Sequence, residues 1–120
     1  MTERPSNNSA VVVGVGASAG LGAALCRRFA QGGLHVFVAG RTQDKIDHVA
    51  AEIQAAGGAA TACLCDTTEE DQVVALFEAA DQYGDGLILT AFNAGNNSRM
   101  PILEMSASWF EKTWRLACFG

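Results

Sequence analysis

The chain contains 120 residues, of which 49% are hydrophobic and 18% are charged, and its net charge at pH 7 is −5. This composition is typical of a single globular domain and excludes an intrinsically disordered chain. No apolar run approaches the roughly 20 residues that cross a bilayer, and the scattered basic residues form no patch for a phosphate backbone. We therefore expect a cytoplasmic protein with no nucleic-acid or membrane partner.

The N-terminal part of the chain changes from a polar tail to a strand and then to a helix. Residues 1–9 lack the apolar stretch of a signal peptide, so we predict a disordered tail before a domain at residues 10–120. Residues 10–15 form a continuous, valine-rich run, as a strand buried on both faces requires. Apolar residues then recur at helical spacing from Leu21 to the glycine pair at 32–33.

A second strand and helix follow immediately. Residues 34–39 form a short apolar run, and Thr42 is a suitable N-cap for the helical pattern behind it. Gly57 ends this helix in the way that glycine commonly does. Residues 59–64 predict a third strand.

The C-terminal part repeats the same alternation. Thr68 and Asp71 have the spacing of a capping box, which predicts the start of a third helix. Residues 87–92, LILTAF, predict a fourth strand, and a last helix is expected to begin near Ser106 or Ser108.

Four strands, each followed by a helix, indicate βαβ units with right-handed crossovers. We predict an α/β fold: a Rossmann-like, doubly wound parallel sheet with strand order 3-2-1-4 in three αβα layers. Such a sheet has two halves, and we expect this chain to be truncated after the helix that follows the fourth strand. That strand would then be an open apolar edge, and Trp109, Phe110 and Trp114 would expose aromatic surface.

A glycine-rich turn follows the first strand, at the place where ligands of open parallel sheets bind. Gly14, Gly16 and Ala19 fit the pattern GxGxxG/A. Gly16, Gly20 and Gly22 fit the longer pattern GxxxGxG. Either pattern lets the backbone approach a diphosphate, with the first N–H groups of the helix facing the anion. The alternative is a turn that only packs the helix on the strand.

The end of the second strand bears on the choice of cofactor. A protein that holds the 2′-hydroxyl of an adenosine ribose places a carboxylate there. This chain instead has Gly40 and Arg41, and a guanidinium suits a 2′-phosphate because it offers paired donors. The alternative is a solvated loop arginine.

Cysteines and histidines give no indication of a metal site. Cys63 and Cys65 share one face of the third strand, but no further ligand completes a set of four, so we expect reduced cysteines that fill apolar space. His35 and His48 lack a ligand cluster, and we expect structural or surface roles for both.

Several motifs at consistent spacing resemble one family. Residues 15–22, VGASAGLG, resemble the TGxxxGxG loop of the short-chain dehydrogenase/reductases, with valine in place of the usual threonine. Asp66 matches the aspartate that faces the adenine ring in that family. Residues 92–95, FNAG, resemble its NNAG motif, and the pair at 40–41 resembles NADP-preferring members. The resemblance selects the GxxxGxG register.

The resemblance implies a set of cofactor contacts. By this resemblance the contacting residues are Gly16, Ser18, Ala19, Gly20, Leu21, Gly22, Arg41, Asp66, Thr67, Asn93, Ala94 and Gly95. Ser18 and Arg41 would contact the 2′-phosphate, and the glycine turn would hold the diphosphate. Asp66 and Thr67 would bracket the adenine. The segment after the fourth strand would line the nicotinamide-side ribose.

The family's catalytic residues lie beyond this chain. They are a serine and a tyrosine followed four residues later by a lysine, after the fifth and sixth strands, and we assign no catalytic or metal-binding residue here. Tyr83 has Leu87 at the fourth place, so we interpret it as a packing residue. Ala117 stands where the family often carries an asparagine that holds a water for proton relay.

The resemblance implies the NADP(H)-binding half of an oxidoreductase that moves hydride between NADPH and a carbonyl or alcohol. We expect NADP rather than NAD and, for the full-length protein, a small-molecule carbonyl or alcohol substrate and a homo-oligomer. The alternatives are a non-catalytic NADP-binding module and an inactive truncated product.

Overall fold

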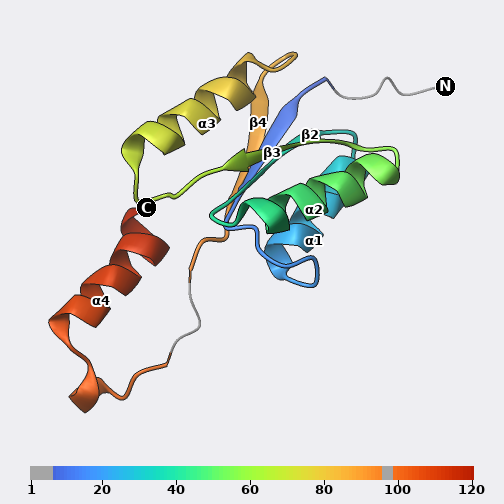
Figure 1. Ribbon diagram of the computed structural model, residues 1–120. Coiled ribbons are helices and arrows are strands. Elements are labelled where there is room, and N and C mark those ends of the chain that lie inside the picture. Colours follow the sequence, from blue (N-terminus) through green and yellow to red (C-terminus); the bar gives the residue numbers. More distant parts are fainter. Residues whose placement is uncertain (1–6, 96–98) are drawn as a thin grey trace.

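The computed structural model describes residues 7–95 and 99–120 and contains one parallel sheet flanked by helices (Figure 1). The strands are β1 (Ser9–Val13), β2 (His35–Gly40), β3 (Ala59–Leu64) and β4 (Leu87–Phe92). The helices are α1 (Leu21–Gln31), α2 (Gln43–Ala55), α3 (Glu70–Gln82) and α4 (Ala107–Trp114), with a 3₁₀ turn at Ile102–Glu104 and a π-helical turn at Arg115–Phe119. The alternation expected from the sequence is therefore confirmed.

The sheet has the order β3-β2-β1-β4, and every pairing is parallel, as predicted. Val11 in the central strand β1 pairs with Phe37 on β2 and with Thr90 on β4. Because each strand is followed by a helix that crosses to the next position, the carboxyl ends of all four strands meet at one edge of the sheet.

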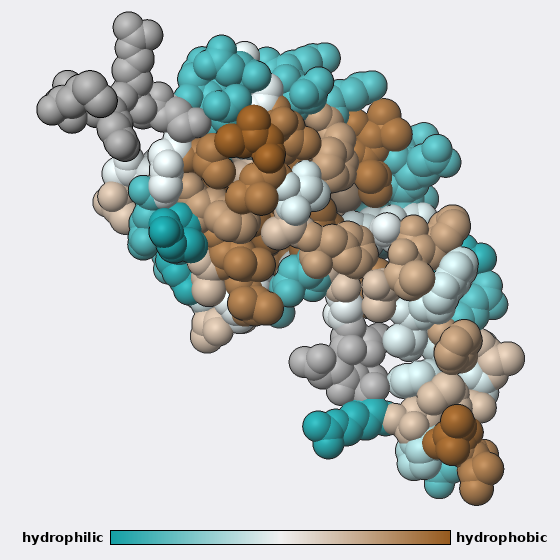
Figure 2. Space-filling view, turned by 180° about the vertical axis from the view of Figure 1, so that it is seen from behind, coloured by the Kyte–Doolittle hydropathy of each residue, from teal (hydrophilic) through white to brown (hydrophobic). Residues whose placement is uncertain are grey.

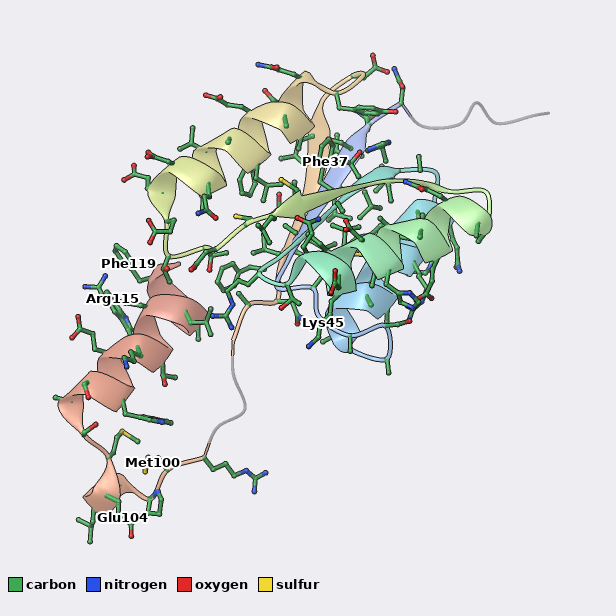
Figure 3. The ribbon with its side chains drawn as sticks, in the orientation of Figure 1. Phe37, Lys45, Met100, Glu104, Arg115 and Phe119 are labelled. Carbon is green, nitrogen blue, oxygen red and sulfur yellow. The ribbon has the colours of Figure 1, made fainter. Side chains whose placement is uncertain are left out.

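Two hydrophobic clusters fill the two sides of the sheet and define the three layers. On one side, Val12 and Val38 pack with Cys26 of α1 and with Ile46 and the other buried apolar residues of α2. The cluster on the opposite side contains the alternate residues of β1 and β2, Cys65 directly after β3, and residues of α3. Its members are Val11, Val13, Phe37, Ala39, Cys65, Leu76 and Ala80. Figure 3 shows Phe37 on the α3 side of the sheet. The predicted αβα arrangement is thus observed.

The first strand is shifted toward the N-terminus relative to the prediction of 10–15. Ser9, which we assigned to the tail, is fully buried and begins β1; its hydroxyl donates to the Ala80 carbonyl at 2.6 Å. The strand ends at Val13 because Gly14 adopts φ +89°, a conformation that a strand residue does not take. Of the predicted tail, residues 1–6 lie outside the described residues.

Of the predicted helix caps, the cap of α3 differs from what the structure shows. The capping box at Thr68 and Asp71 is wrong: Glu69 occupies the N-cap of α3, and Thr68 instead donates its hydroxyl to Asp66 Oδ1 at 2.7 Å. Thr42 does occupy the N-cap of α2, but its side chain forms no capping hydrogen bond. Ser106 caps α4 as expected and accepts a hydrogen bond from the Trp109 N–H at 3.1 Å.

Hydrophobic surface remains exposed on β4 and α4. Ile88 is 63% exposed and Phe92 48% on the edge strand, while Phe110 is 59% exposed on α4. Figure 1 shows α4 set apart from the sheet, and in Figure 2 apolar residues gather across the middle of the molecule. The open apolar edge predicted for β4 is present. Within residues 7–95 and 99–120, no helix combines the length and apolarity needed to cross a membrane.

Candidate functional site

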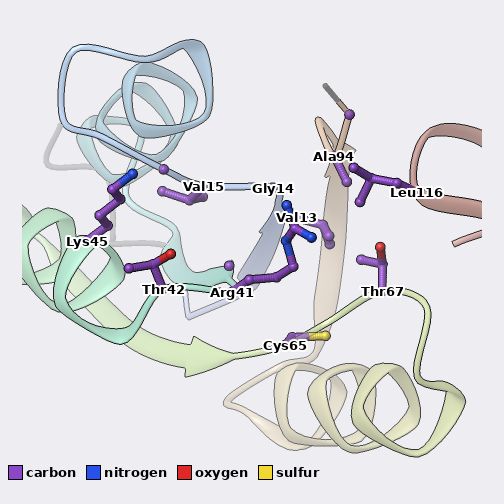
Figure 4. A pocket seen from close by; sticks show the side chains of 13 residues that line it. Val13, Gly14, Val15, Arg41, Thr42, Lys45, Cys65, Thr67, Ala94 and Leu116 are labelled. Carbon is purple, nitrogen blue, oxygen red and sulfur yellow. The ribbon is translucent and has the colours of Figure 1, made fainter. Parts of the chain in front are cut away.

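A cavity of about 210 Å³ opens at the edge where the strands end (Figure 4). It is lined by Val13, Gly14, Val15, Gly16, Gly40, Arg41, Thr42, Lys45, Cys65, Thr67, Ala94, Gly95 and Leu116. These residues come from the carboxyl ends of all four strands, the first turn of α2 and the π-helical turn near the C-terminus. Ligands of open parallel sheets bind at this edge.

Gly14 turns the chain out of β1 and lets β4 approach. A Cβ at this residue would collide with the backbone nitrogen of Ala94, and its φ of +89° is itself unfavourable for other residues. The N–H groups of Gly14 and Val15 both donate to the Ala39 carbonyl, at 3.0 and 2.9 Å. The turn is therefore fixed against both neighbouring strands before any ligand binds.

The three glycines of the GxxxGxG pattern differ in what surrounds them. A Cβ at Gly16 would meet nothing within 4 Å, so the backbone there is open to a ligand. Gly20 is the N-cap of α1 and offers no side-chain cap, which leaves the first N–H groups of the helix without a side-chain partner. At Gly22 a Cβ would lie 3.0 Å from the Gly14 carbonyl, so this glycine allows α1 to pack closely on the turn. A helix N-terminus behind an open glycine turn is suited to an anion.

The end of β2 carries Arg41 into the cavity wall. Gly40 before it is buried, and a Cβ there would collide with the Val15 carbonyl and lie 2.8 Å from Ile46 Cγ2. This close packing places Arg41 directly beside the glycine turn (Figure 4). Among the described residues, no acidic side chain lines this cavity.

Asp66 lies just beyond β3 and is held in an ionised form. Hydrogen bonds from the Thr68 hydroxyl and N–H, at 2.7 and 2.9 Å, lower the pKa of its carboxyl, and the charge of Arg41 adds a smaller contribution. Its own N–H donates to Gln72 Oε1 at 2.8 Å. Asp66 and Arg41 also line a second, more open cavity of about 520 Å³.

The segment after β4 closes the other side. The Asn93 N–H donates to the Val13 carbonyl at 2.8 Å, and its side-chain amide lies 3.4 Å from the Gly14 carbonyl. Asn93 thus braces the turn after β1. Ala94 and Gly95 face the cavity, and a Cβ at Gly95 would meet nothing within 4 Å.

The structure brings part of the predicted set to the cavity. Its wall includes Gly16, Arg41, Thr67, Ala94 and Gly95. The predicted residues outside the wall are Ser18, Ala19, Gly20, Leu21, Gly22, Asp66 and Asn93. Most of the latter belong to the turn and first residues of α1, beside the opening, where the Ser18 hydroxyl lies 3.4 Å from Arg27 Nη1.

Sequence reasoning missed several residues of the wall. Thr42 and Lys45 follow Arg41 closely in the sequence, and that spacing at the start of a helix was the available signal. No pattern in the sequence indicates that Cys65 and Leu116 belong to the wall. Their positions depend on how the end of β3 and the C-terminal turn are placed around the cavity.

Three of the cysteines and His35 have structural surroundings. Burial raises the pKa of the Cys26 thiol to about 12, and burial also raises the pKa values of Cys63 and Cys65. His35 stacks on Tyr83 with ring centroids 4.0 Å apart, which makes Tyr83 a packing residue. No group of three or more potential ligands that could hold a metal ion is found in the described part of the chain.

A family model described as "short chain dehydrogenase" matches residues 10–120, which includes every element of the fold except the first residue of β1. The chain belongs to the short-chain dehydrogenase family. The family resemblance of the sequence motifs is thereby confirmed.

Curated short-chain dehydrogenase relatives act on different substrates. The chain is 33% identical over 107 residues to "Fatty acyl-CoA reductase" of Acinetobacter baylyi, covering 88% of this chain and 36% of that protein. It is 34% identical over 105 residues to "7alpha-hydroxysteroid dehydrogenase" of Escherichia coli, covering 88% of this chain and 41% of that protein. The chain therefore spans well under half the length of these relatives.

Solved structures of short-chain dehydrogenases superpose closely. One from Rhodopseudomonas palustris has a TM-score of 0.87 at 39% identity, covering 96% of this chain and 53% of that one. A 7α-hydroxysteroid dehydrogenase in complex with NADH and 7-oxo glycochenodeoxycholic acid has a TM-score of 0.84 at 32% identity, covering 97% and 44%. The described fold is thus the Rossmann-like, nucleotide-binding half of a short-chain dehydrogenase.

Proposed function

We propose that this chain binds NADP(H) and forms the cofactor-binding part of an oxidoreductase that transfers hydride between NADPH and a carbonyl or alcohol. The observation that carries the cofactor choice is Arg41, which lines the cavity at the end of β2 with no acidic side chain beside it in the wall. A similar hydroxysteroid dehydrogenase was solved with NADH, so family membership alone does not select the cofactor. The selection rests on the residues at the end of β2.

The diphosphate is assigned to the turn after β1. Its oxygens would meet the first backbone N–H groups of α1 from Leu21 onward, where no side chain caps the helix; the Gly20 N–H already donates to the Ala17 carbonyl at 2.9 Å. The open surroundings of Gly16 support this assignment, because a bound phosphate needs space that a Cβ would occupy. Ser18 and Arg41 would contact the 2′-phosphate.

The two halves of the dinucleotide are assigned to different strands. Asp66 and Thr67 would hold the adenine, supported by the ionised, fixed carboxylate of Asp66, which can accept the exocyclic amine. Asn93, Ala94 and Gly95 would line the nicotinamide-side ribose, supported by the open space at Gly95. The nicotinamide supplies the hydride chemistry when bound, and these residues bind and orient it.

A non-catalytic NADP-binding module is the second candidate, and Ala117 favours it. This alanine occupies the register in which family members often carry an asparagine, and its methyl group cannot hydrogen-bond a water. NADPH binding without turnover in the full-length protein, over a panel of carbonyl compounds, would support this candidate over the oxidoreductase.

Substitution of Arg41 by aspartate tests the cofactor assignment. We expect Arg41→Asp to weaken NADPH binding and to strengthen NADH binding, because a carboxylate repels the 2′-phosphate and accepts the ribose hydroxyl. Isothermal titration with both cofactors measures the ratio of affinities. Arg28→Asp, an equal charge change at an exposed residue in the last turn of α1, is the matched control. An unchanged NADPH to NADH ratio in Arg41→Asp would overturn the assignment.

A further inference from the structure

Lys45 extends into the same cavity wall as Arg41, although it belongs to the following helix. We propose that Lys45 is a second cation for the 2′-phosphate and determines, together with Arg41, the preference for a 2′-phosphorylated dinucleotide. This inference rests on the proposed function, since it specifies how the same site would recognise its cofactor.

The geometry places the two cations on one side of the cavity. Lys45 lies in the first turn of α2, and its N–H donates to the Thr42 carbonyl at 3.1 Å. Figure 4 shows the Thr42 hydroxyl between the two cationic side chains, with the Lys45 amine directed toward Val15 on the glycine turn. A phosphate at this position could be approached by a guanidinium, an ammonium and a hydroxyl from one short segment.

Charges of both signs occur in this segment, since Asp44 and Asp47 flank Lys45. Lys45 lies at the positive end of the α2 dipole, where a cation is disfavoured, and close in sequence to a second cation. Among the described ion pairs none involves Arg41 or Lys45, although Asp66 lies near enough to Arg41 to have its pKa lowered. Asp47 is hydrogen-bonded to Gln43 at 2.8 Å rather than to Lys45. Neither cation has an ion-pair partner among the described residues, and a bound phosphate would provide one.

The position of Lys45 favours the 2′-phosphate over the diphosphate. The lysine follows β2, which carries the ribose-binding position of a dinucleotide fold, whereas the diphosphate meets the N-terminus of α1. Arg41 offers a rigid fork of donors and Lys45 a point charge on a flexible stem, so the two can serve different oxygens of one phosphate.

Two nucleotides that differ only in the 2′-phosphate isolate this contact. Adenosine 2′,5′-bisphosphate and 5′-AMP are titrated into the wild-type chain, Lys45→Gln, Lys45→Arg and the control Arg28→Gln, each at two salt concentrations. We expect Lys45→Gln to lose about tenfold in affinity for the bisphosphate, and to change 5′-AMP binding by less than about twofold. Lys45→Arg should retain most of the bisphosphate affinity, and Arg28→Gln should match the wild type. The bisphosphate affinity of Lys45→Gln should also depend less on salt.

The outcomes separate this inference from the proposed function. If wild-type chain binds both nucleotides equally, the NADP(H) proposal fails and the Lys45 assignment fails with it. If wild type prefers the bisphosphate but Lys45→Gln keeps the full preference, Lys45 is a solvated lysine and only this inference is overturned. An equal loss for both nucleotides would place Lys45 on the 5′-phosphate and would also overturn it. Lys45 is exposed, so thermal melts of the variants should coincide with that of the wild type.

Discussion

Arg41 owes its position to the residue before it. Gly40 is packed so closely against the Val15 carbonyl that no side chain fits, and this contact brings the end of β2 against the turn after β1. The sequence could predict the place of Arg41 because the residue after β2 is defined by its own strand. It could not predict that Gly14 must be a glycine for the fold, because the obstacle to a Cβ there is Ala94, which is distant in the sequence.

The three buried or half-buried cysteines should be unreactive in the folded chain. Burial raises the pKa values of the Cys26, Cys63 and Cys65 thiols, so little thiolate forms, whereas Cys118 is exposed. We expect iodoacetamide at about pH 8 to modify Cys118 first. Peptide mass spectrometry after brief labelling measures this order. Labelling of Cys26 as fast as Cys118 would contradict the described burial.

Asp66 should make stability depend on acidic pH. Its folded-state pKa is lowered by the Thr68 hydrogen bonds, so its contribution to stability is present above the unfolded-state pKa and is lost as pH falls through the folded-state value. We expect Asp66→Asn to cost at most about 1 kcal/mol at neutral pH, since the residue is only partly buried and solvent screens its charge, and less at about pH 2. Urea unfolding at both pH values measures the difference. A cost that stays constant with pH would show that the carboxylate charge is not involved.

At the scale of elements, apolar runs were sufficient to predict the strands, and local polar contacts were not predictable in the same way. Short apolar runs predict the strands, and β1 to β4 are found there, although only the valine-rich strands β1 and β2 are buried on both faces. The cap of α3 was mispredicted because the Thr68 hydroxyl donates to Asp66 Oδ1 instead of accepting from a backbone N–H at the start of the helix. The earlier start of β1 was also not predictable from the local sequence. Ser9 is buried because its hydroxyl donates to the Ala80 carbonyl of α3, which is distant in the sequence.

Alanine at two glycines should separate the fold from the site. Gly40→Ala introduces a Cβ against the Val15 carbonyl and Ile46, so we expect a loss of about 2–3 kcal/mol in the free energy of unfolding. Gly16→Ala meets nothing within 4 Å and should change stability by less than about 0.5 kcal/mol.

Cofactor binding should be sensitive to Gly16→Ala, although the stability of this variant is not. Because the open space at Gly16 is the space assigned to the diphosphate, Gly16→Ala should weaken NADPH binding while remaining folded. Denaturant unfolding and cofactor titration of the same preparations test both statements. A Gly16→Ala variant with wild-type affinity would remove the glycine turn from the proposed site.

The whole molecule is elongated, with principal extents of 61 × 28 × 25 Å. Helix α4 extends away from the sheet and contributes to this length (Figure 1). On α4, Phe110 is 59% exposed and Trp114 is 42% exposed. Trp114 stacks on Phe119 at 5.1 Å between ring centroids, so part of this aromatic surface covers itself. The remainder, together with the β4 edge, is more apolar surface than an isolated monomer usually exposes.

This surface should cause the chain to associate with copies of itself. Ile88 is 63% exposed on the unpaired edge of β4, and a lysine there should reduce edge-to-edge pairing. We expect sedimentation to show mass increasing with concentration for the wild type and less so for Ile88→Lys. Ile102→Lys, at an exposed residue in the 3₁₀ turn, is the control. A wild-type chain that stays monomeric at all concentrations would contradict the expectation.

The central claim is that the end of β2 selects a 2′-phosphorylated dinucleotide, and direct titration of the wild-type chain with NADPH and NADH under identical conditions tests it most directly. Because Arg41 and Lys45 face the cavity with no acidic side chain in its wall, we predict that NADPH binds at least about tenfold more tightly than NADH. Equal affinities, or a preference for NADH, would contradict the account.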